Sequence, residues 1–166
     1  MRHIISILLQ NEAGALARVS GMFASRGYNI ESLSVAPTVD ATVSRLTLMA
    51  AGSAAVIEQI VKQLGKMVDV VKVVDYSDLD HIECELLLAK LRVQGASARG
   101  VIECVRRHRG QVLDEADYMR TVQLTGTAAE VDAFIEDLAQ VAEVVEIVRT
   151  GGVALERGAA ILKMPD

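Results

Sequence analysis

Residues whose types could support catalysis are few and scattered in this chain of 166 residues. Of the three histidines, His3 stands near the start, His81 lies in a predicted linker and His108 belongs to a basic cluster, and none has a plausible catalytic neighbour. The two cysteines, Cys84 and Cys104, show neither a CxxC pair nor a histidine at zinc-ligand spacing, so we interpret them as buried thiols. The sequence therefore predicts no catalytic residue and no metal site.

Two charged groupings each allow a functional and a structural interpretation. Glu83 and Glu85 would share one face of a strand and could form a carboxylate pair, although a solvated strand face is the more common arrangement. The basic cluster Arg106–Arg109 could receive an anionic group or an acidic partner. It also lies at a predicted helix C-terminus, where cations are favourable without any ligand.

The most informative segment is Asn11–Leu16 (Asn-Glu-Ala-Gly-Ala-Leu), between a predicted strand and a predicted helix. Its glycine, Gly14, allows backbone N–H groups to point into an open space at the positive end of the helix. A carboxylate or a phosphate can bind at such a helix start. By itself this composition is also typical of an ordinary turn.

A second segment, Arg26–Ser32, joins the same helix to the next strand, with Gly27 as the predicted helix end. The two segments lie at opposite ends of one helix, so within a single chain they cannot easily share a small ligand. A twofold dimer could instead bring the loop of one chain beside the strand of the other.

Apolar periodicity predicts the elements that position these segments. In the first half we expect strands at Ile4–Leu9, Ile30–Ala36, Val43–Ala51 and Val68–Val74, and helices at about Ala15–Arg26 and Val56–Leu64. Ser53 is the predicted N-cap of the second helix and Gly65 its end. The resulting order is β-α-β-β-α-β.

The same order restarts after Asp75–Asp80, a short acidic segment that we interpret as a linker. The expected strands are Glu85–Val93, Val112–Ala116, Met119–Thr125 and Val144–Val148, with helices around Val101–Val105 and Val131–Leu138. We therefore predict an α+β fold of two ferredoxin-like units, in domains 1–76 and 77–166. Both helices of a unit should cover one face of a four-stranded antiparallel sheet. The second unit or another chain should cover the other face, and a homodimer is the simplest solution.

Composition excludes several classes of protein. The longest uncharged run, Leu46–Ile57, is too short to cross a bilayer, and the apolar stretch Ile4–Leu9 is too short for a secretion signal, so we expect a cytoplasmic protein. The chain has 17 basic and 22 acidic side chains, a formal net charge of −5, and only 3% aromatic residues. This leaves little to neutralise phosphates or stack bases, so nucleic acid is not an expected partner.

Several motifs together resemble a known family. The run Asn-Glu-x-Gly-x-Leu (11–16), followed by Phe-x-x-Arg-Gly-Tyr-Asn-Ile-Glu-Ser-Leu-x-Val-Ala (23–36), is similar to the ACT domain of the small regulatory subunit of acetolactate synthase. Ser44–Thr47 and Gln63–Val70 extend the match in the first half. Arg109–Gly110, Leu124–Gly126 and Glu146–Gly151 extend it through the second. The resemblance covers essentially the whole chain.

The resemblance implies a subunit that performs no chemistry and holds no cofactor. It would bind a separate catalytic subunit that carries thiamine diphosphate, magnesium and usually FAD, and would raise the activity of that subunit. It would also allow a branched-chain amino acid, most plausibly valine, to inhibit the first common step of branched-chain amino-acid synthesis.

The resemblance also implies where the amino-acid effector binds, namely between two ACT domains of a homodimer. Carried over position by position, one wall of the site consists of Asn11, Ala13, Gly14, Ala15 and Leu16, and the opposite wall of Asn29 and Ile30 from the other chain. The effector carboxylate should meet N–H groups at the helix start, its ammonium group should meet asparagine or backbone oxygens, and its side chain should meet apolar atoms.

Three other functions compete with this interpretation. A free-standing ACT-type amino-acid sensor would share the ligand site but have no catalytic partner. An RNA-binding module can have the same element order, but it needs aromatic residues on its central strands, and the only candidate is Tyr118 at a strand edge. A small enzyme on this scaffold would need an acid–base constellation that the sequence lacks.

Overall fold

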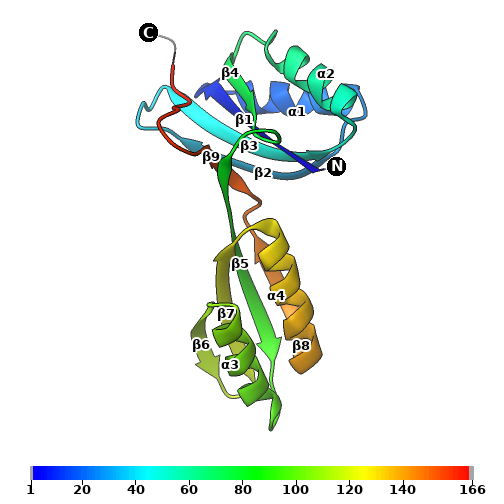
Figure 1. Ribbon diagram of the computed structural model, residues 1–166, viewed down its shortest axis with the longest axis vertical. Coiled ribbons are helices and arrows are strands. Elements are labelled where there is room, and N and C mark those ends of the chain that lie inside the picture. The colour runs from blue at the N-terminus through cyan, green and yellow to red at the C-terminus, as the bar shows by residue number, and fades with distance from the viewer. Residues whose placement is uncertain (1, 165–166) are drawn as a thin grey trace. The chain divides into compact units, whose positions relative to one another are not determined.

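The computed structural model describes residues 2–164, which divide into two compact units (Figure 1). Unit 1 contains the chain up to Ile82 together with the segment that begins at Gly151, and unit 2 is Glu83–Thr150. In the part of the chain that the structure describes, no helix is long and apolar enough to span a membrane.

Unit 1 has the predicted β-α-β-β-α-β order and a four-stranded antiparallel sheet with strand order β2-β3-β1-β4. Its elements are β1 (Arg2–Gln10), α1 (Ala15–Ser25), β2 (Ile30–Pro37), β3 (Val43–Ala51), α2 (Ala54–Leu64) and β4 (Val70–Asp75). Within residues 2–164, strand β2 is therefore an edge strand of this sheet and pairs with β3.

The core of unit 1 forms because alternate residues of the two central strands face the helices. Ile5 and Ile7 of β1 stand opposite Leu48 and Leu46 of β3, and all four are fully buried. From the helices, the buried residues Val19 and Phe23 of α1 and Ile57, Ile60 and Leu64 of α2 pack on them. Helices α1 and α2 thus share one face of the sheet (Figure 1), as the sequence predicted.

The other face of this sheet carries the C-terminal segment with strand β9 (Val153–Glu156), which the sequence did not predict. The Arg45 side chain of β3 donates a hydrogen bond of 2.8 Å to the Ala154 carbonyl oxygen. Gly151 has a φ of 76°, and a Cβ atom there would lie 2.6 Å from the Ser32 Cβ, so only glycine fits this approach. The chain itself therefore supplies cover that we expected from unit 2 or another chain.

The domain division consequently differs from the expected boundary at residue 76. The segment from residue 151 onward returns to unit 1, although its sequence position suggested the second domain. Its Arg157 side chain pairs with Asp80 at 3.2 Å, and β9 pairs with β5. The physical cause is the second face of the unit 1 sheet, which offers buried apolar surface to this segment.

Unit 2 repeats the element order with a sheet of order β6-β7-β5-β8, and this confirms the predicted α+β fold of two ferredoxin-like units. Its elements are β5 (His81–Arg92, of which the first two residues belong to unit 1), α3 (Ser97–Arg107), β6 (Gln111–Ala116), β7 (Met119–Gly126), α4 (Ala128–Val141) and β8 (Glu143–Arg149). Leu87 and Leu91 of β5 pack with Val101 of α3 and with Phe134 and Leu138 of α4. Helix α4 starts with a reciprocal capping box between Thr127 and Glu130.

Candidate functional site

A pocket of about 260 Å³ opens where β1 ends and α1 begins. Four of its lining residues, Asn11, Glu12, Ala15 and Leu16, belong to the segment singled out in the sequence. The others are Leu9, Gln10, Val35, Ala36, Pro37 and Ser44, from the end of β1, the end of β2 and the start of β3. The pocket is of the size that a small amino acid requires, and it is lined largely by apolar atoms.

The start of α1 suits an anionic ligand. Gly14 is the N-cap residue with a left-handed φ of 84°, and α1 has neither a side-chain cap nor an acidic residue in its first turn. A side chain at position 14 would be strained, and its Cβ would lie 2.8 Å from the Arg18 guanidinium. The positive end of the helix therefore has no carboxylate or hydroxyl of its own to satisfy it.

Asn11 fixes the loop against the β2–β3 hairpin. Its backbone N–H donates to the Thr42 carbonyl at 2.8 Å, and its side-chain Nδ2 donates to the Ala41 carbonyl at 2.9 Å. With the amide nitrogen engaged in this way, the side-chain oxygen is the atom left to accept a hydrogen bond from a ligand.

An ion pair that the sequence analysis missed holds the helix start in place. The Arg18 guanidinium donates two hydrogen bonds, of 2.6 and 2.7 Å, to the buried Asp69 carboxylate. These bonds lower the pKa of Asp69 and raise the pKa of Arg18. The Asp69 carbonyl also accepts the Gln10 N–H at 2.8 Å, so one residue ties α1 to the end of β1.

Asn29 and Ile30 lie at the other end of α1, as the spacing predicted. The helix ends at Ser25, Gly27 has a φ of 68°, and Ile30 begins β2. With 11 residues, α1 is about 16 Å long, so a small ligand at Gly14 in one chain cannot also touch Asn29 of that chain. Ala13 and Gly14 stand in the loop beside the pocket, and only Asn29 and Ile30 are remote from it.

The pocket residues that sequence reasoning missed come from the hairpin of β2 and β3. Pro37 pairs with Ser44, and Ala36 with Arg45, which places the end of β2 beside the β1–α1 connection. The sequence predicted the hairpin itself. The strand order β2-β3-β1, which brings Val35–Pro37 to this pocket, was not available from local patterns.

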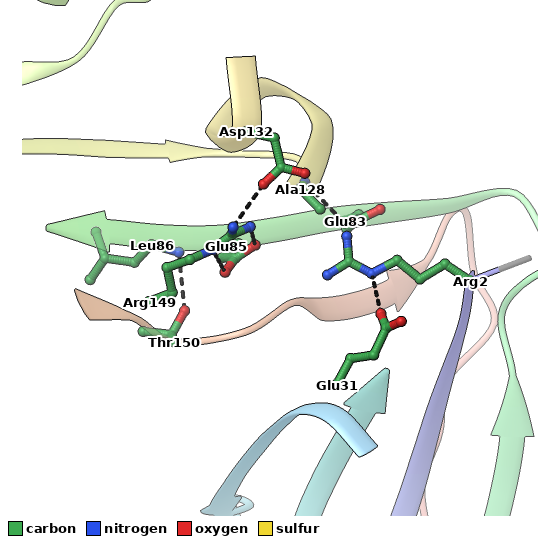
Figure 2. Close-up of polar contacts among 9 residues, drawn as sticks. All are labelled: Arg2, Glu31, Glu83, Glu85, Leu86, Ala128, Asp132, Arg149 and Thr150. Carbon is green, nitrogen blue, oxygen red and sulfur yellow. Dashed lines mark hydrogen bonds and ion pairs between the residues drawn. The ribbon is translucent and has the colours of Figure 1, made fainter. Parts of the chain in front are cut away.

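The two carboxylates considered as a catalytic pair have separate structural partners in unit 2 (Figure 2). Glu85 is buried and accepts hydrogen bonds of 2.8 and 2.9 Å from Arg149, which also donates to Asp132 at 2.7 Å. Glu83 accepts the Ala128 N–H at the start of α4. The expectation of a solvated face was therefore wrong for Glu85, because Arg149 on the neighbouring strand compensates its charge. These carboxylates raise the pKa of Arg149.

A ferredoxin-like unit whose uncapped, glycine-started helix borders a small apolar pocket has the architecture of an ACT domain. Residues 5–72 match the family model described as an AHAS small subunit-like ACT domain. Residues 84–158 match the model described as the small subunit of acetolactate synthase. The chain therefore belongs to the acetolactate synthase small-subunit family, whose members are regulatory and not catalytic.

Similar proteins cover nearly the whole chain. The acetolactate synthase small subunit of Haemophilus influenzae is 50% identical over 95% of this chain and 97% of its own length. The isozyme 3 small subunit of Escherichia coli strain K12 is 47% identical over 98% of this chain and 100% of its own. The crystal structure of the Thermotoga maritima small subunit has a TM-score of 0.86 at 36% identity, covering 96% of this chain and 99% of that one.

Proposed function

We propose that this regulatory subunit forms a homodimer through antiparallel pairing of its two β2 edges, and that this pairing completes two amino-acid sites. The observation that carries the proposal is the position of the pocket at the Pro37 end of an edge strand, with Asn29 and Ile30 at the opposite end. In an antiparallel pair centred between Leu33 and Ser34, the Ile30 end of each strand lies beside the Pro37 end of the other.

The effector is a branched-chain amino acid, and valine is the first candidate. Its carboxylate binds the free N–H groups at the start of α1, next to Gly14. Its ammonium group meets the Asn11 side-chain oxygen and the second copy's Asn29. Its apolar side chain packs against Leu16 and the second copy's Ile30. The pocket volume of about 260 Å³ supports a ligand of this size.

The dimer acts on the catalytic subunit of acetolactate synthase. That subunit carries thiamine diphosphate, magnesium and usually FAD, and the small subunit contributes none of these cofactors to the reaction. Binding of the dimer raises catalytic activity, and the effector inhibits because it binds one geometry of the dimer more tightly than the other. A free-standing sensor is less well supported, because residues 84–158 match a model specific to these small subunits.

Reconstitution with the catalytic subunit tests the proposal through two variants of one position. Gly14→Asp adds bulk and a negative charge where the effector carboxylate binds, so it should abolish valine inhibition and leave activation intact. Gly14→Ala carries the same backbone strain without the charge and should weaken valine binding only about tenfold. Inhibition of the Asp variant at unchanged valine concentration would place the effector elsewhere. Absence of any stimulation by the wild-type chain would favour the free-standing sensor.

A further inference from the structure

Unit 2 contains a cluster of three potential metal ligands that the regulatory function does not use. Cys104 and His108 lie one helical turn apart, in α3 and at its C-cap, and Asp137 lies on α4. One ligand atom from each, a sulfur, a ring nitrogen and a carboxylate oxygen, lies within 4.8 Å of the other two. The His108 Nε2 and the Asp137 Oδ2 are 2.7 Å apart.

The cluster does not suit a cysteine nucleophile. Cys104 is fully buried, whereas a nucleophilic cysteine needs access to its substrate. His108 makes its hydrogen bond through Nε2 to Asp137 and packs against the Phe134 ring at 5.2 Å between centroids. The cluster instead places three potential ligand atoms, a sulfur, a nitrogen and an oxygen, close to one another, as the ligands of a metal site are.

We propose that Cys104, His108 and Asp137 bind a divalent transition-metal ion, with zinc as the best match. Zinc takes sulfur, imidazole nitrogen and carboxylate oxygen ligands together, and sites with three protein ligands keep a fourth position for water. A thiolate and a carboxylate balance the two positive charges of the ion, so the occupied centre is neutral and can remain inside the unit.

Two features of the surroundings affect metal binding: Arg107 competes with the ion for Asp137, and a cleft borders His108. Arg107 Nη1 donates to the same Asp137 oxygen at 3.2 Å, so the ion replaces this contact as well as the hydrogen bond from His108. His108 also lines a cleft of about 360 Å³, together with Arg107, Arg109, Leu124, Thr125 and Glu130. Of the three proposed ligands, His108 is the one that borders this cleft.

The sequence contained part of this signal. Cys104 and His108 are four positions apart, and on a helix that spacing places two side chains on one face. The expected absence of a metal site was based on CxxC pairs and zinc-finger spacings, which do not include this helical pair. The third ligand, Asp137, comes from a different helix and becomes visible only through the packing of α3 on α4.

Cobalt titration of the full-length chain, after treatment with a chelator, tests the proposal. Co²⁺ should bind at one ion per chain and give the near-ultraviolet absorption of a sulfur-to-metal charge transfer, and Zn²⁺ should displace it. Cys104→Ala should remove this absorption. Cys84→Ala, which changes the other free cysteine, should leave it unchanged and serves as the matched control.

Two further variants keep the test decisive if Cys104→Ala does not fold. His108→Asn and Asp137→Asn should each weaken cobalt binding by at least about tenfold, since even outer partners of metal ligands matter by that factor. Circular dichroism should first establish that each variant is folded. Absence of a charge-transfer band in the wild type, or binding that both of these folded variants retain, would overturn the proposal.

Discussion

The two units share one order of elements but treat the second face of their sheets differently. In unit 1 the helices cover one face and the C-terminal segment with β9 packs on the other, so buried residues such as Ser6 and Met49 lie on that second face. In unit 2 taken by itself, the face opposite the helices includes the half-buried Leu88 and the 54% exposed Val148. The second face of the sheet is therefore covered by the chain itself in unit 1, whereas in unit 2 taken by itself it is accessible.

In each unit one ion pair between an arginine and a buried carboxylate has a structural role, and the two roles differ. In unit 1 the pair of Arg18 and Asp69 fixes the start of α1 beside the pocket. In unit 2 the pair of Glu85 and Arg149 joins the neighbouring strands β5 and β8 (Figure 2). The comparison indicates that an ion pair fixes a helix start beside a pocket in unit 1 and joins two strands in unit 2.

The largest expected effect is on unit 2, from Arg149→Met. This change leaves the buried Glu85 carboxylate without its partner and should lower the free energy of unfolding by about 3 kcal/mol. Arg92→Met removes an exposed ion pair with Glu143 and should cost less than about 1 kcal/mol. Urea denaturation of both variants measures the difference. Equal losses would show that Glu85 and Arg149 do not hold the sheet.

Gly151→Ala tests the cover of the second face in unit 1. The new methyl group meets Ser32 and the backbone is left-handed, so we expect a loss of about 2 kcal/mol and faster hydrogen exchange in β9. Gly158→Ala has a similar φ of 82° but open space around the new methyl group, and should cost about 1 kcal/mol. If the two variants behave alike, the segment does not pack against Ser32.

The sequence predicted the elements well where one local pattern decided the outcome. Val43–Ala51 has the predicted bounds, because the alternation of apolar and polar residues between two turns marks this strand locally. β9 was missed because a four-residue strand has no periodicity of its own and depends on a partner strand, β5, that is distant in the sequence. The pocket wall at Val35–Pro37 and the burial of Glu85 likewise depend on strand order, which no local pattern encodes.

A smaller effect on stability should distinguish an N-cap residue that makes a side-chain hydrogen bond from one that does not. The Thr127 side chain accepts the Glu130 N–H at the start of α4, so Thr127→Ala should lower the unfolding free energy by about 1 kcal/mol. Ser53 is the N-cap of α2 but makes no side-chain hydrogen bond to the helix. Ser53→Ala should therefore change the unfolding free energy by less than about 0.5 kcal/mol. Thermal unfolding of both variants is sufficient to compare them. A larger loss from Ser53→Ala would contradict the capping assignment.

The smallest effect concerns pH. Because the Arg18 contact lowers the pKa of Asp69, it contributes stability above the pKa of an aspartate in the unfolded chain, about 3.9. That contribution is lost as the pH falls through the lower value in the folded chain. The difference in unfolding free energy between the wild type and Asp69→Asn should therefore shrink as the pH falls below about 4. Asp78→Asn controls for the loss of one negative charge, and a difference that is independent of pH would contradict the prediction.

The central claim is that each effector site combines the Asn11–Leu16 loop of one chain with Asn29 and Ile30 of another. Mixed dimers of Gly14→Asp and Asn29→Trp chains test it most directly, by calorimetric titration with L-valine and with D-valine as the control. Each variant alone should have no site. In a mixed dimer both changes fall on one site and the other is intact, so random mixing should restore about one quarter of the wild-type sites. No restored binding in mixtures that contain mixed dimers would contradict a site shared between chains.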